Sequence, residues 1–220
     1  FGELTVSGYP PEDLVLKPAF QQAVEDAVTE LAQETADGGP AVLIGSPWRL
    51  DGALYNAALL LDVGEIRAVR TKSHLPNYGV FDEKRVFAAG PLSGPILFRG
   101  VRLGVMICED MWSGDVTECL DESGAEILIV INGSPFETDK QDDRLNYAVA
   151  RVIESRLPLI YVNLVGGQDE LVFDGGSFVL SADRNLCTKA RAFEEELLIT
   201  DWRRVSDAWV CEGGPIKSAL

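Results

Sequence analysis

Residues 104–112 read Gly-Val-Met-Ile-Cys-Glu-Asp-Met-Trp, and the interpretation of the chain starts from this stretch. An apolar run stops at Cys108, two carboxylates follow at once, and a polar break predicts the start of a helix. The carboxyl end of a strand is where α/β sheets commonly hold their reactive groups. Free cysteine is also among the most buried residue types. The stretch therefore predicts a strand that ends on either a nucleophile or a packing residue.

Composition narrows the possible partners and compartments. The 220 residues are 46% hydrophobic, enough for the core of one domain. Acidic residues outnumber basic ones by 35 to 19, and the net charge of -16 argues against nucleic acid and anionic membranes as partners. No apolar run reaches the ~18 residues that cross a bilayer. The four cysteines show neither a CxxC pair nor zinc spacing, so we expect no metal site and a reducing cytoplasm.

Hydrophobic periodicity predicts helices that alternate with β-hairpins. Apolar residues three and four positions apart predict amphipathic helices over residues 20–31 and 140–156, and a shorter helix over 115–122. The predicted strands are residues 41–45, 55–62, 65–71, 96–98, 101–107, 125–131, 159–163, 177–180 and 197–200. The run over 125–131 is apolar throughout, which is typical of a sheet interior that helices cover. The order predicts an α/β fold of two sheets with helices outside them.

Both ends of the chain resemble cut points in a longer polypeptide. The chain opens on Phe1-Gly2-Glu3-Leu4, without a methionine, which predicts the tail of a strand already under way. It closes on Gly-Gly-Pro-Ile-Lys-Ser-Ala-Leu over residues 213–220, a composition typical of a linker. We expect one domain between these ends.

A cysteine nucleophile would need a base. Cysteine attacks carbon as a thiolate, and a free thiol with a pKa of ~8.5 is mostly protonated at neutral pH. The only histidine, His74, stands in a charged loop, and a Cys108–His74 pair is one alternative. A glutamate in a dry pocket can instead accept and return the proton, and Glu3 lies at a predicted strand end. Lys72 ends the predicted strand 65–71, where it could stabilise an oxyanion.

Glu3, Lys72 and Cys108, in this order, resemble the Glu-Lys-Cys triad of the nitrilase superfamily of carbon–nitrogen hydrolases. Longer segments are similar to the glutaminase (amidase) domain of glutamine-dependent NAD synthetases. They are GYPPEDL at 8–14, KSHLPNYGVFDE at 72–83, CEDMW at 108–112, NGSPF at 132–136, FDGGSF at 173–178 and GPI at 214–216. Several long motifs in the right order are far more specific than one short pattern.

The resemblance implies a four-layer αββα sandwich, with a glutaminase domain over residues 1–212 and the start of a linker over 213–220. It implies glutamine as substrate and a thioester intermediate on Cys108. Glu3 would be general base and acid, and Lys72 would stabilise the oxyanion together with the backbone N–H after the nucleophile.

The resemblance also implies a binding pocket and a larger assembly. Glu83 matches a second glutamate that helps to hold the pocket, and Tyr78, Phe81, Ser134 and Lys140 fall where the family lines the glutamine site. No cofactor is expected for this domain. ATP and Mg would serve a C-terminal synthetase domain of the same polypeptide, which would use the released ammonia to amidate nicotinic acid adenine dinucleotide to NAD. A homo-oligomer is expected.

Two other functions stay open on sequence alone. The chain could be a stand-alone amidase of the same superfamily that acts on another small amide or nitrile. It could also be an inactive structural fragment whose site is incomplete. Within the expected site, Glu109 and Asp110 more simply begin a helix or anchor neighbouring loops than act as catalytic groups, because carboxylates beside a thiolate raise its pKa.

Overall fold

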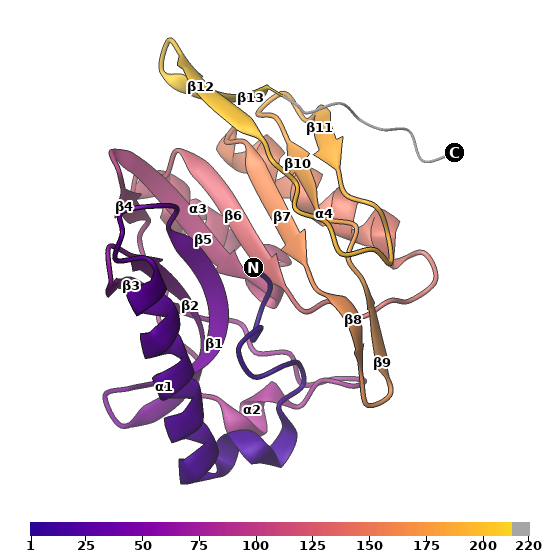
Figure 1. The fold of residues 1–220 in the computed structure, drawn as a ribbon. Coiled ribbons are helices and arrows are strands. Elements are labelled where there is room, and N and C mark those ends of the chain that lie inside the picture. The colour runs from indigo at the N-terminus through magenta and orange to yellow at the C-terminus, as the bar shows by residue number, and fades with distance from the viewer. Residues whose placement is uncertain (213–220) are drawn as a thin grey trace. The chain divides into compact units, whose positions relative to one another are not determined.

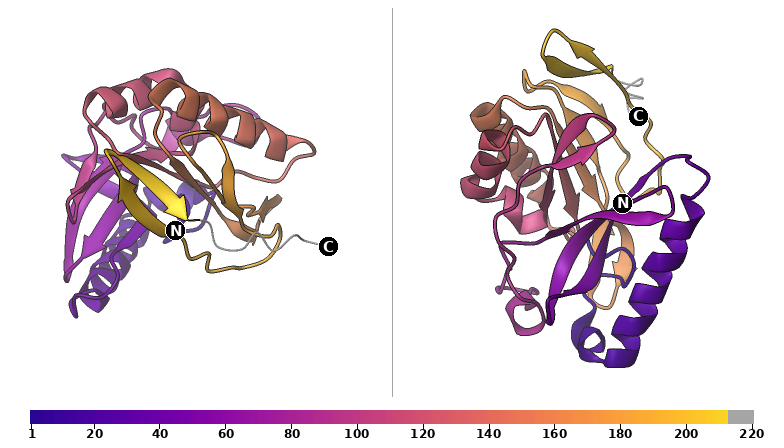
Figure 2. Two further views of the ribbon diagram at one scale, coloured as in Figure 1. Left: turned by 90° about the horizontal axis from the view of Figure 1, so that it is seen from above. Right: turned by 90° about the vertical axis from the view of Figure 1, so that its left-hand side faces the viewer.

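The computed structural model describes residues 1–212, and these form two compact units that divide between Leu92 and Ser93 (Figures 1 and 2). Each unit combines a β-sheet with helices, so the predicted α/β class is confirmed. The domain predicted over residues 1–212 spans both units, and its boundaries stay a prediction. The linker predicted over residues 213–220 lies outside the described residues.

The first unit is a three-stranded antiparallel sheet covered by one long helix (Figure 1). Its elements are the 3₁₀ helix η1 (Glu12–Leu16), α1 (Pro18–Glu34), β1 (Val42–Leu50), β2 (Ala53–Asp62), β3 (Glu65–Thr71) and α2 (Glu83–Val86). The strand order is β1-β2-β3. α1 buries Val28 and Ala32 against Ile44, Leu59 and Leu61 of the sheet. This is the apolar stripe that the helical periodicity predicted.

The N-terminal segment is held against β1 although it is not a strand. Residues 3–7 form turns rather than the predicted strand tail. The backbone nitrogen of Phe1 lies 2.8 Å from the carbonyl oxygen of Leu43, and the N–H of Gly45 donates to the carbonyl of Gly2 (3.1 Å). A Cβ atom on Gly45 would lie 2.4–2.7 Å from backbone atoms of this segment, so glycine permits the close approach. Glu3 is thereby fixed and fully buried.

The second unit is built on a six-stranded mixed sheet with the order β11-β10-β7-β6-β5-β4. Its elements are β4 (Ile96–Phe98), β5 (Val101–Ile107), η2 (Cys108–Met111), α3 (Gly114–Glu122), β6 (Ile127–Asn132), α4 (Lys140–Ser155), β7 (Leu159–Asn163), β8 (Val165–Gln168), β9 (Leu171–Asp174), β10 (Phe178–Leu180), β11 (Leu186–Lys189), β12 (Asp201–Val205) and β13 (Ala208–Glu212). α3 and α4 lie side by side on one face (Figure 2). β8–β9 and β12–β13 form two-stranded sheets.

The parallel strands β5, β6 and β7 set the place of the chemistry. They pair in register, with Ile107 opposite Ile131 and Asn132 opposite Asn163. The residues that follow these strands therefore share one edge of the sheet, where α/β folds hold their ligands. Cys108 follows β5 directly, as predicted.

A second strand prediction, near the C-terminus, is also wrong. Residues 197–200 are not a strand, and β12 begins only at Asp201. Leu197 is 87% exposed and Ile199 is 72% exposed, so these apolar side chains have no core to face. Alternation of apolar residues predicts a strand only where one face is buried. Across residues 1–212, no helix is long and apolar enough to cross a membrane.

Candidate active site

A buried lysine lies between two buried carboxylates in the first unit. The Nζ atom of Lys72 lies 2.6 Å from Oε1 of Glu3 and 2.9 Å from Oε1 of Glu83. Glu3 and Lys72 are both 0% exposed, and Glu83 is 4% exposed. Buried charges are stable only when they are paired and hydrogen-bonded. Three side chains from the N-terminal segment, the end of β3 and the start of α2 thus form one ionic cluster.

Two neutral side chains complete this cluster. The hydroxyl of Tyr9 donates to Oε1 of Glu83 (2.9 Å). The Nδ2 atom of Asn56 donates to Oε1 of Glu3 (2.7 Å) and lies 3.4 Å from Oε2 of Glu83. The backbone carbonyl of Asn56 also accepts the N–H of Lys72 (2.8 Å). Asn56, in the central strand β2, therefore contacts all three charged residues.

The environment of Glu83 changes its acidity. Burial raises the pKa of the Glu83 carboxyl to about 7, the ammonium of Lys72 opposes this shift, and the nearby charge of Glu3 adds to it. A cluster of two carboxylates and one ammonium can hold an additional proton near neutral pH. Such shifted groups are typical of sites that transfer protons.

Cys108 occupies a tight turn in the second unit. Its φ of +48° lies in the left-handed region, which few residues other than glycine adopt. The N–H of Ile107 donates to the carboxylate of Asp110 (3.1 Å), which fixes the turn from β5 into η2. The thiol is largely buried. Backbone strain of this kind at a strand end is a feature of sites where one side chain must be presented in a fixed direction.

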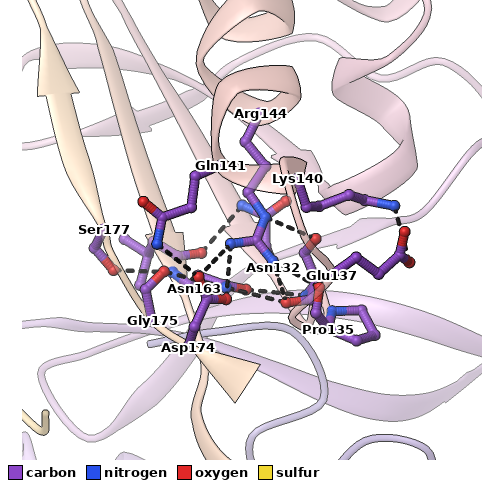
Figure 3. A network of polar contacts seen from close by, with 12 residues as sticks. Asn132, Pro135, Glu137, Lys140, Gln141, Arg144, Asn163, Asp174, Gly175 and Ser177 are labelled. Atoms are coloured by element: carbon purple, nitrogen blue, oxygen red, sulfur yellow. Dashed lines mark hydrogen bonds and ion pairs between the residues drawn. The ribbon is translucent and has the colours of Figure 1, made fainter. Parts of the chain in front are cut away.

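A polar network lies at the ends of β6 and β7 (Figure 3). The guanidinium of Arg144 donates to both carboxylate oxygens of Asp174 (2.8 and 3.0 Å), to Oγ of Ser134 (3.0 Å) and to the carbonyls of Ser134 and Pro135 (both 2.8 Å). Asn163 accepts the N–H of Ser134 (2.9 Å) and donates to its carbonyl (3.1 Å). Ser134 is therefore held on several sides.

Tyr161 connects this network with Cys108. Its hydroxyl is fully buried and interacts with the side chain of Ser134. Burial raises the pKa of Tyr161, the positive charge of Arg144 opposes the rise, and the charge of Cys108 adds to it. The hydroxyl of Tyr161 is thus influenced by both Cys108 and Ser134, so these two residues belong to the same polar region of the second unit.

The remaining predicted site residues lie in more open positions. Tyr78 is 49% exposed and packs edge-to-face on Phe81, with ring centroids 5.5 Å apart. Lys140 pairs with Glu137 (3.2 Å; Figure 3). Its ammonium also lies over the ring of Trp112, 5.2 Å from the centroid. The hydroxyl of Ser134 is instead bonded by Arg144, one turn further along α4.

The structure shows functional candidates that the sequence reading missed. Arg144 and Asp174 form a buried ion pair, and Asn56 bridges the glutamates. Asn56 is a polar residue within the apolar run 53–61, and this alone does not identify a function. Arg144 lies four residues after Lys140, among charged residues at the start of a helix, and sequence alone does not separate it from a solvated arginine. No group of three or more potential metal ligands occurs within residues 1–212.

Known proteins match the chain across almost its whole length. The family model described as "Carbon-nitrogen hydrolase" matches residues 1–206. A protein of Rhodobacter capsulatus named glutamine-dependent NAD(+) synthetase is 45% identical over 207 residues, which are 94% of this chain and 37% of that protein. A synthetase of the same name from Xanthomonas campestris is 39% identical over 100% of this chain and 41% of its own length. The chain thus spans about two fifths of these relatives.

Solved structures give the same result for the fold. The glutamine-dependent NAD+ synthetase of Acinetobacter baumannii superimposes with a TM-score of 0.88 at 35% identity, over 98% of this chain and 41% of that one. A carbon–nitrogen hydrolase of Helicobacter pylori gives 0.70 at 27% identity, over 88% of this chain. The predicted nitrilase-like fold class and the resemblance stated from sequence are confirmed. The chain belongs to the carbon–nitrogen hydrolase family and is an enzyme of that type.

Proposed function

We propose that this chain hydrolyses the side-chain amide of glutamine to glutamate and ammonia through a thioester on Cys108. The observation that carries the proposal is the buried Glu3–Lys72–Glu83 cluster, combined with a cysteine in a strained turn at a strand end. Family membership supplies the reaction class, cleavage of a carbon–nitrogen bond. The named relatives, which are glutamine-dependent, supply the substrate.

The first half of the proposed reaction forms the thioester. Glu3 takes the proton of the Cys108 thiol as the sulfur attacks the amide carbon. The carbonyl oxygen becomes an oxyanion, which the ammonium of Lys72 and the backbone N–H after the nucleophile stabilise. The carbon–nitrogen bond then breaks, and the leaving nitrogen receives the proton from Glu3 and departs as ammonia.

The second half returns the enzyme to its starting state. Glu3 takes a proton from water, and the hydroxide attacks the thioester carbon. The carbon–sulfur bond breaks, the new carboxylic acid releases its proton to solvent and leaves as glutamate, and the thiolate of Cys108 recovers the proton from Glu3. A single carboxyl therefore acts alternately as base and acid. Glu3 is suited to this alternation because the ammonium of Lys72 and the amide of Asn56 hold its carboxylate in place.

The substrate-binding roles in this proposal follow the family resemblance. In this proposal Tyr78 and Phe81 contribute aromatic walls, Glu83 holds the pocket, and Ser134 presents polar atoms that Arg144 orients. Lys140 is the weakest member of this set, because Glu137 and Trp112 already occupy its ammonium. No cofactor takes part in the proposed hydrolysis.

The whole protein would do more than this chain. Because the relatives are more than twice as long, we propose a C-terminal synthetase domain that uses ATP and Mg and consumes the ammonia. The product would be NAD, made by amidation of nicotinic acid adenine dinucleotide. We also propose a homo-oligomer in the cytoplasm.

Covalent labelling tests the proposed nucleophile and substrate together. An electrophilic analogue of glutamine should add once to the wild-type chain, and peptide mass spectrometry should place the adduct on Cys108. Cys108→Ala should abolish the adduct and reduce glutamine hydrolysis by at least about 10³-fold. Cys119→Ala is the matched control, because Cys119 is a half-buried cysteine on α3 outside the site, and it should label like the wild type. Labelling of Cys108→Ala would contradict the assignment.

A substrate panel separates glutamine from other small amides. The proposal expects glutamine to be hydrolysed with a kcat/KM well above that of asparagine, aliphatic amides and nitriles. Faster turnover of an aliphatic amide would instead identify a stand-alone amidase. In the longer protein, Cys108→Ala should keep NAD synthesis from added ammonia while losing synthesis from glutamine. Continued use of glutamine by that variant would overturn the proposed coupling.

A further inference from the structure

The side chain of Asn56 lies at the centre of the charged cluster in the first unit. Asn56 comes from the central strand β2 and is fully buried. Its Nδ2 atom lies 2.7 Å from Oε1 of Glu3 and 3.4–3.5 Å from the two oxygens of Glu83. Its backbone carbonyl accepts the N–H of Lys72. One residue thus contacts every charged member of the cluster.

The amide is oriented by what it donates. A side-chain amide has two N–H donors and one carbonyl acceptor. The Nδ2 atom of Asn56 faces the carboxylates of Glu3 and Glu83. Its Oδ1 atom, in contrast, has no hydrogen-bond partner among residues 1–212. A buried acceptor without a partner is costly. The amide nevertheless keeps its donor on Glu3 and Glu83. A role in packing alone does not explain this orientation.

We propose that Asn56 is a positioning residue that holds the Glu3 carboxylate against Lys72. A hydrogen bond donated to a carboxylate favours the charged form. The donor is neutral, so it fixes the carboxylate without adding a second positive charge that would compete with Lys72. The groups that face this amide in the first unit are Glu3, Lys72 and Glu83, and Tyr9 reaches the same carboxylate of Glu83.

Asn56→Leu is the decisive variant. Leucine is close to asparagine in size, removes the donor, and also removes the acceptor that lacks a partner. If the polar contacts of Asn56 have no role, the variant should therefore be well folded and active. The positioning role predicts a loss of about 10- to 100-fold in kcat with KM changed less than about threefold. It also predicts that the acid limb of the kcat profile moves up by about one pH unit.

The control is Ser46→Ala, and a second readout does not need activity. Ser46 is fully buried in β1 and bonds only the neighbouring carbonyl of Pro47, so its loss should leave kcat and the pH profile unchanged. Carbon-13 NMR of labelled glutamate carboxyls, assigned with Glu3→Gln and Glu83→Gln, follows proton uptake by the cluster directly. Asn56→Leu should move this uptake to higher pH, and Asn56→Ser, which keeps a hydroxyl donor, should move it less.

The inference depends on the proposed function only for the kcat and KM measurements, because the NMR titration does not require activity. Should the wild-type chain fail to hydrolyse glutamine while Asn56→Leu still shifts the carboxyl titration, the proposed function fails and the positioning role stands. An unchanged titration and an unchanged kcat profile in folded Asn56→Leu would overturn the inference. So would unfolding of both Asn56 variants while Ser46→Ala stays folded, because this result would assign Asn56 to the packing of the sheet.

Discussion

At the scale of single residues, Glu83 is the group whose protonation connects stability with pH. Its carboxyl is buried beside Lys72 and Glu3, and burial raises its pKa from the ordinary value of 4.5 to about 7. Between these two values the folded state binds a proton that the unfolded chain has already released. The free energy of unfolding must therefore fall as pH rises through this window.

Glu83→Gln should remove this dependence. In the wild type, the contribution of Glu83 is complete below pH 4.5 and is lost as pH rises to about 7, with a total change of order 2–3 kcal/mol. Glutamine keeps an acceptor for Lys72 but does not titrate. The difference in unfolding free energy between variant and wild type, measured by urea denaturation at a series of pH values, should therefore change across this window.

The matched control for Glu83 titrates in the opposite sense. The guanidinium of Arg49 lowers the pKa of Glu25, so this residue contributes stability that is lost only as pH falls below 4.5. Glu25→Gln should leave the slope between pH 5 and 7 as it is in the wild type. Parallel curves for Glu83→Gln and wild type would mean that Glu83 titrates normally.

The sequence predicted which residues carry reactive groups, but it did not predict which side chains surround them. The predicted strand ends carry Lys72 and Cys108, and Glu3 meets Lys72 at 2.6 Å, while their catalytic roles stay predictions. Asn56 was missed because an amide within an apolar strand has no characteristic spacing. Asn56 stands out only because the carboxylates of Glu3 and Glu83 lie beside it, and these come together only in the folded chain.

At the scale of elements, Arg144 is the residue that anchors α4 to the loop after β6 and to β9. Arg144 connects the helix with the loop after β6 and with Asp174 at the end of β9, and both members of this ion pair are buried (Figure 3). The guanidinium suits this place because its planar array of donors can bind a carboxylate and two carbonyls at once. Ser134, which we assign to the pocket, depends on the same arginine.

Arg144→Ala should be among the most destabilising single changes in the second unit. It leaves the carboxylate of Asp174 buried with only Gln141 as a remaining donor, and breaking a buried pair typically costs about 3–5 kcal/mol. Thermal and urea unfolding measure the loss. Arg191→Ala is the control, because its ion pairs are half exposed, and it should cost less than about 0.5 kcal/mol. Equal losses in the two variants would refute the special role of Arg144.

Elements with continuous or strictly periodic apolar residues were predictable, and so were the hairpins β2–β3 and β4–β5, whereas the first hairpin was missed. β5 and β7 have the predicted bounds, and α4 differs from its prediction by one residue. β1 was predicted to end at Gly45 but continues to Leu50. The missed signal is Asp51-Gly52, whose positive φ angles of +50° and +82° form the tight turn into β2. Asp-Gly between apolar runs is a strong hairpin signal.

The C-terminal strands could not be read from hydrophobicity. β12 is exposed at four of its five positions, so it lacks the buried face from which alternation arises. The pairing of β12 with β13 rests on backbone hydrogen bonds in register, from Asp201 opposite Glu212 to Val205 opposite Ala208. A strand without a core-facing side leaves little trace in the sequence.

At the scale of the whole molecule, fold class was predictable and the internal division was not. Alternation of apolar runs with helical stripes leads to an α/β fold by simple layer packing. The two compact units divide between Leu92 and Ser93, within the segment Gly-Pro-Leu-Ser-Gly-Pro over residues 90–95. Glycine and proline mark loops of every kind, so this segment does not differ in composition from an ordinary connection.

The net charge of the whole chain predicts how its stability depends on salt. Acidic residues exceed basic ones by 16, and mutual repulsion of the excess charge destabilises a compact state. Salt screens this repulsion, because the Debye length falls from about 30 Å at 0.01 M to about 10 Å at 0.1 M. Salt also weakens surface ion pairs, but each contributes only about 0–1 kcal/mol, so relief of repulsion should dominate.

Stability should therefore rise with ionic strength at neutral pH. Between 10 and 300 mM sodium chloride at pH 7.5 we expect the unfolding midpoint to increase by about 2–6 °C, which corresponds to roughly 1–2 kcal/mol for a chain of this size. Differential scanning calorimetry measures the midpoint. The same titration at pH 5 is the control, because partial protonation of the carboxyls lowers the net charge and should reduce the increase. A midpoint that falls with salt at pH 7.5 would show that ion pairs outweigh the excess negative charge.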